Sequence, residues 1–154
     1  MNKKKLCFAA STGGHFEQLM MLSPLMNKYD SFIVTENTEY RLSAGDRKIY
    51  YITQVNRKER AFPFKMVQIS FQSLKILLRE KPDVVITTGV LAMVPICLLA
   101  KLLGKKLIYI ESFAKVSTPT QSGKLLYRFA DQFYVQWESM LDVYPNAIFK
   151  GGIY

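Results

Sequence analysis

Short apolar runs recur along the chain, and stretches with helical spacing separate several of them. Many of these runs are apolar throughout, whereas a strand with one face in water alternates apolar and polar residues. Strands that are buried on both faces and alternate with helices are typical of a parallel sheet covered on each side. We therefore predict an α/β fold with a doubly wound parallel sheet, with strands near residues 6–10, 31–35, 48–52, 84–87, 107–110, 132–135 and 147–149.

Three helices are expected from the spacing of apolar residues between these strands. Residues 16–26 carry apolar side chains toward the sheet, and Pro24 bends or ends this helix. Pro63 suits the first turn of a helix that runs to about Arg79. Residues 90–103 are nearly all apolar but are fewer than the roughly 20 that cross a bilayer. This last segment is either a buried core helix or an interfacial one.

A glycine-rich turn, Ser11-Thr12-Gly13-Gly14-His15, joins the first expected strand to the first expected helix. Free N–H groups at a helix N-terminus attract anions such as phosphate, and glycine lets a ligand approach the backbone closely. We therefore expect residues 11–14 to bind a phosphate, with the only histidine of the chain beside it. The alternative is a tight βα turn whose histidine only caps the helix.

Two further polar loops follow strands at the same edge of the expected sheet. One contains Thr88 and Gly89, and the other begins with Glu111-Ser112 and includes Lys115. Ligands of open α/β sheets bind beyond the carboxyl ends of the strands, so the three loops together predict a cleft. Thr88, Gly89, Ser112 and Lys115 are expected to contact phosphate there, although a lone loop lysine is more commonly just solvated.

Length and composition fit one globular domain, since the chain has 154 residues, of which 49% are hydrophobic. A net charge of +9 favours nucleic acid, an anionic membrane or a phosphorylated ligand as partner. Nucleic acid is disfavoured because neither an RNA-binding aromatic signature nor a groove-reading helix is present. Cys7 and Cys97 lie within apolar runs and share no metal-type spacing, so we expect buried thiols in a reducing compartment. We expect neither a metal nor a cofactor.

Basic residues crowd around the second and third expected helices. An apolar helix face flanked by lysine and arginine is what a protein lying on an anionic membrane presents. We expect Arg57, Lys58, Arg60 and Lys65 to form such a surface. The alternative is a solvated basic rim over an ordinary core. The apolar run near the N-terminus is shorter than the roughly 7–15 residues of a signal peptide, so we expect a protein at the cytoplasmic face.

With these motifs identified, the chain resembles the acceptor-side half of split GT-B glycosyltransferases. The likeness is to bacterial capsule and exopolysaccharide accessory subunits, which are related to the membrane-anchoring subunit of the dolichol-pathway UDP-N-acetylglucosamine transferase. It is similar, more distantly, to the N-terminal domain of the N-acetylglucosaminyltransferase that makes lipid II. The matching stretches are distributed over nearly the whole chain and are residues 11–15, 81–89, 109–112, 122–127, 130–131 and 135–137. Among them, Glu111-Ser112 and Val135-Gln136-Trp137 are the specific ones.

The resemblance implies one Rossmann-like domain over residues 1–154 that is inactive, or nearly so, alone. It also implies a separate donor-binding glycosyltransferase subunit, which this chain recruits to the membrane and to a lipid-diphosphate-linked sugar acceptor. Eukaryotic members begin with a transmembrane helix, so membrane attachment here is expected to rest on the basic and apolar surface. The alternative is a stand-alone nucleotide- or phosphate-binding protein, which the lack of Gly-x-Gly-x-x-Gly after the first strand disfavours.

The resemblance also assigns roles to single residues. Gly13 and Gly14 would expose N–H groups to the acceptor diphosphate, and His15 is a candidate base. Glu111 is the competing base, with a structural hydrogen-bond role as its alternative.

Aromatic residues near the C-terminal end are candidates for the partner interface. Trp137, the only tryptophan, follows a strand and either anchors the partner chain or packs in the core. The segment from Phe149 to Tyr154 is a second candidate interface, where the donor-binding domain would dock.

Overall fold

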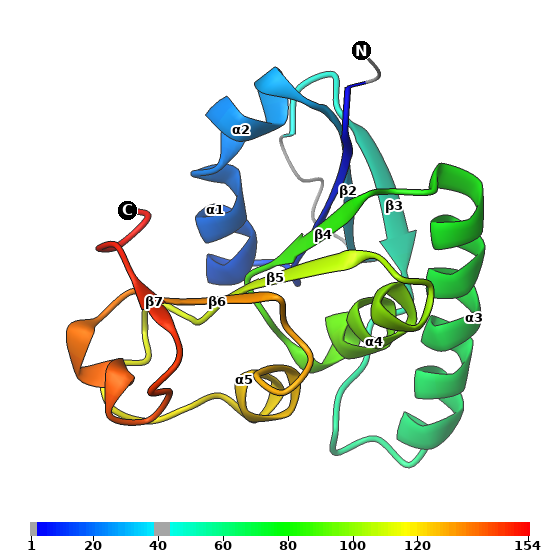
Figure 1. The fold of residues 1–154 in the computed structure, drawn as a ribbon. Coiled ribbons are helices and arrows are strands. Elements are labelled where there is room, and N and C mark those ends of the chain that lie inside the picture. Colours follow the sequence, from blue (N-terminus) through cyan, green and yellow to red (C-terminus); the bar gives the residue numbers. More distant parts are fainter. Residues whose placement is uncertain (1–2, 39–43) are drawn as a thin grey trace.

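The computed structural model describes residues 3–38 and 44–154. In these residues, seven strands form one parallel sheet in the order β3-β2-β1-β4-β5-β6-β7 (Figure 1). The chain runs outward from β1 to β3 and then returns to the other side of β1, so the order reverses between β1 and β4. The strands are β1 (Lys5–Ala9), β2 (Asp30–Glu36), β3 (Lys48–Ile52), β4 (Val84–Thr87), β5 (Lys106–Ile110), β6 (Gln132–Val135) and β7 (Ile148–Phe149).

Helices cover both faces of this sheet, which confirms the doubly wound arrangement (Figure 1). Helices α1 (Gly14–Met20) and α2 (Ser23–Lys28) lie on one face. Helices α3 (Phe62–Glu80), α4 (Val94–Leu102) and α5 (Gln121–Leu126) lie on the other, with the short 3-10 turns η1 (Leu91–Met93) and η2 (Glu138–Leu141). Alternate residues of β1 face opposite sides of the sheet. Cys7 belongs to the core beneath α3, α4 and α5, and Phe8 belongs to the core beneath α1 and α2.

The expected helix over residues 16–26 is two helices. Helix α1 ends at Met20, and Pro24 stands in the first turn of α2. A proline has no N–H to continue the ladder of hydrogen bonds, so it ends one helix and suits the start of the next. The placement of Pro63 in the first turn of α3 is as predicted.

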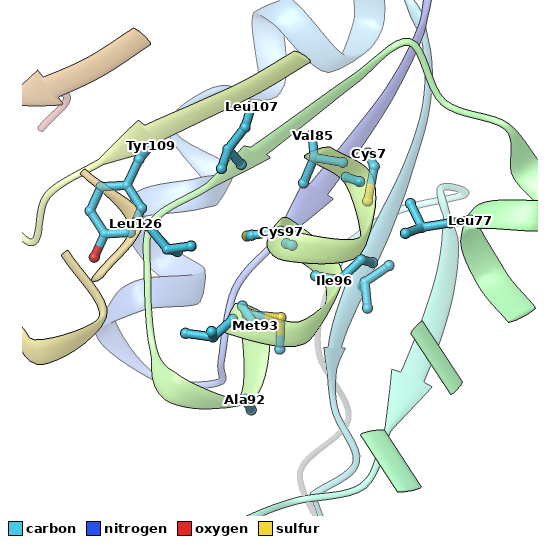
Figure 2. Packing of buried hydrophobic residues seen from close by; sticks show 14 of the residues in the cluster. Cys7, Leu77, Val85, Ala92, Met93, Ile96, Cys97, Leu107, Tyr109 and Leu126 are labelled. Atoms are coloured by element: carbon cyan, nitrogen blue, oxygen red, sulfur yellow. The ribbon is translucent and has the colours of Figure 1, made fainter. Parts of the chain in front are cut away.

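The apolar segment over residues 90–103 is a core helix. Ile96, Cys97 and Ala100 of α4 are fully buried, and the helix packs against α3 and β5. Figure 2 shows Ile96 and Cys97 among the buried side chains of the sheet. Both cysteines are free and buried as expected, and burial raises the pKa of the Cys97 thiol to about 12. No helix in the described residues is long and apolar enough to cross a bilayer.

A buried carboxylate ties together the amino ends of the strands. Glu80, at the end of α3, lies 2.6 Å from Lys5 Nζ and 2.5 Å from Lys48 Nζ, and it accepts a hydrogen bond from the Tyr50 hydroxyl. Burial alone raises the pKa of a carboxyl group. The hydrogen bonds from Lys48, Lys5 and Tyr50 outweigh burial here and lower the pKa of Glu80 to about 2. This cluster lies at the edge opposite the expected cleft and serves stability.

Candidate functional site

The first two polar loops meet at the point where the strand order reverses. His15 Nδ1 lies 2.8 Å from the carbonyl oxygen of Thr88, and Thr88 Oγ1 donates to the carbonyl of His15, also at 2.8 Å. A carbonyl oxygen only accepts, so Nδ1 carries the proton in this arrangement. In the neutral ring, Nε2 is then the nitrogen with a free lone pair. The turn thus presents an imidazole with a fixed tautomer.

The glycine turn leaves its backbone open to a ligand. Gly13 has a φ of 75°, which favours glycine, and its carbonyl accepts from the N–H groups of Phe16 and Glu17. No atom lies within 4 Å of a Cβ built at Gly13 or Gly14. Helix α1 has only seven residues, so side chains must supply much of any attraction for an anion.

Two consecutive residues after β4 have positive φ. Gly89 has a φ of 102°, and a Cβ there would lie 2.7 Å from the Tyr109 hydroxyl. Val90 has a φ of 87°, although it is β-branched. Such a conformation costs roughly 1–3 kcal/mol and is found mainly at functional sites. The strain therefore marks this turn as a candidate part of the site.

A cleft of about 550 Å³ opens beside this turn. It is formed by His15, by the loop between β3 and α3, by the start of η1 and by the start of α5. Two cations, Arg57 and Lys58, line it, and no aspartate or glutamate does among the described residues. The lining residues are His15, Gln54, Val55, Asn56, Arg57, Lys58, Val90, Leu91, Ala92, Thr120, Gln121 and Ser122.

Glu111 lies under the α5 wall of this cleft and is fully buried. Its carboxylate accepts hydrogen bonds from Ser112 N at 2.9 Å, from Thr120 Oγ1 at 2.9 Å and from the Tyr144 hydroxyl at 2.9 Å. A Cβ at Gly123 would lie 2.2 Å from Oε2, so the carboxylate occupies the space that glycine leaves. Of the two roles considered for Glu111, this geometry favours the structural one.

Glu36, at the carboxyl end of β2, is the second buried carboxylate beside the cleft, and the sequence pattern did not identify it. It accepts from Ser11 Oγ at 2.5 Å and from Val55 N at 3.1 Å. The Ser11 hydroxyl, expected at a phosphate, is therefore bonded to Glu36. One buried carboxylate thus fixes each wall of the cleft: Glu36 the wall with Val55, and Glu111 the wall with Thr120.

The residues that were expected to bind phosphate lie near the cleft but do not line it. Thr88 is hydrogen-bonded to His15 but does not itself line the cleft. The other expected phosphate ligands are also absent from the described lining; they are Ser11, Thr12, Gly13, Gly14, Gly89, Ser112 and Lys115. Ser112 is buried and its hydroxyl accepts from Ala114 N at 3.3 Å.

The four expected membrane-surface residues separate into two pairs. Arg57 and Lys58 line the cleft, whereas Arg60 and Lys65 lie outside it. Lys65 forms an ion pair with Glu59. Helix α3 also carries an apolar stripe on its outer face, at positions three, four and seven residues apart. The stripe consists of Phe64 (81% exposed), Val67 (56%), Phe71 (68%) and Leu78 (55%).

An aromatic cluster forms where the C-terminal segment meets the loop after β5. The ring of Phe113 lies 5.0 Å from that of Trp137 and 5.1 Å from that of Tyr154. Trp137 is half-buried, and its Nε1 donates to the Phe113 carbonyl at 2.7 Å. Tyr154 and Phe149 are exposed. Trp137 therefore combines core packing with an edge open to solvent.

Buried glutamines connect this cluster to the sheet. Gln136 lies in one of the stretches that carry the family resemblance, but neither it nor Gln18 was assigned a role from the sequence. Gln136 Nε2 donates to Gln18 Oε1 at 3.0 Å and to the Glu111 carbonyl at 2.9 Å. Gln136 Oε1 accepts from Ile153 N at 3.0 Å. An apolar pocket of about 290 Å³ lies nearby, lined in part by Leu22, Leu25, Ile108 and Ile153. Within the described ranges, no group of three His, Cys, Asp or Glu side chains is arranged to hold a metal ion.

Comparison with solved structures supports the fold. The chain resembles MurG of Acinetobacter baumannii with a TM-score of 0.71 and 21% identity, over 86% of this chain and 41% of that one. It resembles a UDP-GlcNAc 2-epimerase from Neisseria meningitidis, bound to UDP-GlcNAc, with a TM-score of 0.73 and 14% identity. That likeness covers 97% of this chain and 47% of the epimerase. The chain thus spans less than half of each structure and has the Rossmann-like fold expected of one half of a GT-B enzyme.

Comparison with known sequences identifies the family. A family model described as "Oligosaccharide biosynthesis protein Alg14 like" matches residues 47–153. The human UDP-N-acetylglucosamine transferase subunit ALG14 is 31% identical, over 94% of this chain and 80% of the human protein. The subunit of that name from Schizosaccharomyces pombe is 45% identical over 46% of this chain and 36% of its own length. The chain therefore belongs to the Alg14-like family of oligosaccharide biosynthesis proteins.

Proposed function

We propose that this chain is the acceptor-side subunit of a two-chain UDP-sugar transferase, with UDP-N-acetylglucosamine as the donor. It recruits a donor-binding catalytic subunit to the membrane and to a lipid-diphosphate-linked sugar. The observation that carries the proposal is the match over nearly the whole chain to a relative named as a subunit of such a transferase. The cleft at the reversal of strand order supports it, because open α/β sheets bind their ligands there.

The site suits the acceptor half of a glycosyl transfer. The acceptor hydroxyl must be positioned and must lose its proton as the new bond forms. His15 lines the cleft, and Thr88 fixes its Nδ1, which leaves Nε2 to take that proton. Glu111 acts as a positioning residue that holds Thr120 at the opposite wall.

We assign membrane binding to the outer face of α3, and we place the protein at the cytoplasmic face of the membrane. An exposed apolar stripe with basic neighbours is typical of a helix that lies in the membrane interface. Phe64 and Phe71 supply the largest exposed apolar area of the stripe, and Arg60 and Lys65 lie near its start.

The aromatic cluster at the C-terminal segment is the surface that we assign to the catalytic subunit. Aromatic residues contribute strongly to interface binding energy, and Trp137, Phe149 and Tyr154 are partly or largely exposed.

We assign the reaction to capsule or exopolysaccharide synthesis. This assignment rests on the likeness of residues 11–15, 81–89 and 109–112 to subunits of that kind.

Reconstitution tests the proposal. This chain is purified with and without the donor-binding subunit, which we expect a neighbouring gene to encode, and each sample receives UDP-N-acetylglucosamine and a lipid-diphosphate acceptor in vesicles. We expect transfer by the pair and little or none by either chain alone. Full turnover by this chain alone, or none by the stable pair with any lipid-diphosphate acceptor, would contradict it.

Deleting the gene tests the assignment to capsule or exopolysaccharide synthesis. The deletion is expected to reduce the capsular or exopolysaccharide sugar, and an unchanged polymer would overturn that assignment.

A further inference from the structure

Arg57 and Lys58 stand out in the cleft because their charge is not neutralised. Neither side chain forms an ion pair with another described residue. The neighbouring Glu59 pairs with Lys65 instead. Since the described lining holds no carboxylate, the cleft has two uncompensated positive charges beside an imidazole. Such a site attracts an anion.

The backbone that carries these two side chains is fixed. Val55 N donates to the buried Glu36, and Thr53 N donates to Gln72 Oε1 at 2.9 Å. Lys58 N donates to Asn56 Oδ1 at 3.1 Å, which closes a tight turn. Both cationic side chains are exposed on this fixed loop and can therefore meet a ligand without a rearrangement of the fold.

The opposite wall supplies geometry rather than charge. Arg57 Nη1 donates to Gln121 Oε1 at the start of α5, so the guanidinium reaches that wall and meets a neutral amide. The hydroxyl of Thr120 is bonded to Glu111, and that of Ser122 lies 3.3 Å from the Tyr109 hydroxyl. With these groups engaged, Arg57 and Lys58 are the side chains best placed to neutralise a bound anion.

We infer that Arg57 and Lys58 form a clamp for the diphosphate of the lipid-linked acceptor, an inference that rests on the proposed function. A guanidinium fork binds phosphate oxygens in pairs, and an ammonium adds a second charge for the second phosphate. The cleft volume of about 550 Å³ accommodates a diphosphate and the first part of its sugar. Because His15 lines the same cleft, a clamped diphosphate leaves the attached sugar near the imidazole.

The clamp assigns the two pairs of basic residues to different ligands. Arg57 and Lys58 bind the acceptor diphosphate in the cleft, whereas Arg60 and Lys65 remain outside it near the α3 stripe. Binding of a soluble diphosphate, measured without any membrane, therefore tests the clamp independently of a general attraction to anionic membranes.

The test is a calorimetric titration of the chain, without its partner, with geranyl diphosphate. Arg57→Gln/Lys58→Gln is expected to lower the affinity at least tenfold. The matched control is Lys75→Gln/Arg79→Gln, which removes the same charge from exposed positions outside the cleft and is expected to change the affinity less than twofold. Lys65 is not used, because its removal would free the carboxylate of Glu59 beside Lys58.

Two further ligands identify the source of the diphosphate. Geranyl monophosphate is expected to bind at least tenfold more weakly than geranyl diphosphate, and UDP is expected to bind weakly and with equal affinity to both variants. An equal loss in clamp and control variants, or a clamp variant that binds normally, would overturn the inference. UDP binding that is stronger than geranyl diphosphate binding and needs Arg57 and Lys58 would overturn it too, because the clamp would then serve the donor.

The outcome is separable from that of the proposed function. If the pair transfers sugar and Arg57→Gln/Lys58→Gln leaves the acceptor KM unchanged, the clamp is wrong and the transferase stands. If no pair transfers sugar but geranyl diphosphate binding needs Arg57 and Lys58, the clamp stands and the transferase assignment fails. Both positions are exposed, so thermal melting is expected to match the wild type.

Discussion

His15 and Thr88 exchange two hydrogen bonds, in which each side chain donates to the carbonyl of the other residue at 2.8 Å. The pair joins the start of α1 to the end of β4, across the point where the strand order reverses. It fixes both the orientation and the tautomer of the imidazole. The N-cap of α1 is Gly13, and no side chain caps this helix, so the alternative that His15 only caps it is wrong. The bond from the imidazole to the loop after β4 favours a chemical role.

His15→Ala is therefore expected to lower the transfer rate of the reconstituted pair by roughly 10²–10⁴-fold, the usual loss for a general base. The stability cost is expected to be about 1 kcal/mol, since one hydrogen bond to Thr88 is lost. Turnover and melting temperature are measured together. Thr88→Val is the matched variant, because it removes the second hydrogen bond and leaves the imidazole in place. Full turnover by His15→Ala would exclude His15 as the base.

Glu111→Gln is expected to act on stability. Ser112 N, Thr120 N, Thr120 Oγ1 and the Tyr144 hydroxyl all donate to this carboxylate, and an amide would turn an N–H₂ group toward some of these donors. Each unmatched buried group costs roughly 1–3 kcal/mol, so the melting temperature is expected to fall clearly.

Activity of Glu111→Gln at low temperature distinguishes the two roles considered for this residue. A positioning role predicts that the folded variant keeps the pH profile of the wild type and much of its rate. Tyr144→Phe is the matched control, since it removes one donor and no charge. A variant that melts like the wild type but has lost its rate would make Glu111 the base.

The Glu80 cluster predicts a pH dependence of stability. The pKa of Glu80 is lowered from 4.5 to about 2 in the folded chain. A lowered carboxyl pKa contributes stability that is fully present above the unfolded value and is lost as the pH falls from about 4.5 toward 2. We expect a contribution of roughly 1–3 kcal/mol, reduced by the exposure of Lys48 to solvent. Urea unfolding between pH 7 and pH 3 measures it, and Glu80→Gln is expected to flatten the dependence.

The α3 stripe predicts membrane binding that depends on both apolar contact and charge. Phe64→Ser/Phe71→Ser is expected to reduce sedimentation with anionic liposomes while folding is retained, because the two side chains are 81% and 68% exposed. Arg60→Gln is expected to weaken binding by about 1 kcal/mol at low salt. Leu125→Ser, at an exposed position of α5 away from the stripe, is the control. Unchanged sedimentation of the double variant, or equal binding to neutral liposomes, would exclude this surface.

Much of the fold could be predicted because its strands are apolar on both faces. The predicted strand at residues 6–10 differs from β1 (Lys5–Ala9) by one residue at each end, and that at residues 84–87 matches β4. Helix α5 is not predicted because it has only six residues with Gly123 inside it, and the buried carboxylate of Glu111 holds its N-cap residue Thr120. Local pattern carries no signal for such a helix.

The site was only partly predictable, for a related reason. The sequence places His15 at the carboxyl edge of the sheet, which the structure bears out. It does not show that the loop after β3 lies across the same cleft, because that depends on the strand order. The position of Arg57 and the bond from Val55 to Glu36 are therefore tertiary properties.

Substitutions at the two glycines of the first turn distinguish the effect of backbone strain from the effect of blocking a ligand. Gly13 has a φ of 75°, so Gly13→Ala is expected to lower stability by roughly 1–2 kcal/mol through strain. Gly14 has no positive φ, and a Cβ there meets no atom within 4 Å, so Gly14→Ala is expected to fold normally.

Gly14 does not line the cleft, but it is exposed and directly precedes His15, which does, so a methyl group there would narrow the approach of a diphosphate that contacts the turn. Gly14→Ala is therefore expected to raise the acceptor KM of the reconstituted pair severalfold, with kcat changed less, and Gly14→Val is expected to raise it further. Steady-state kinetics against the lipid-diphosphate acceptor, with the donor saturating, measures both values. Wild-type kinetics in Gly14→Val would mean that the acceptor does not approach this turn, and that the side chains of the cleft hold it alone.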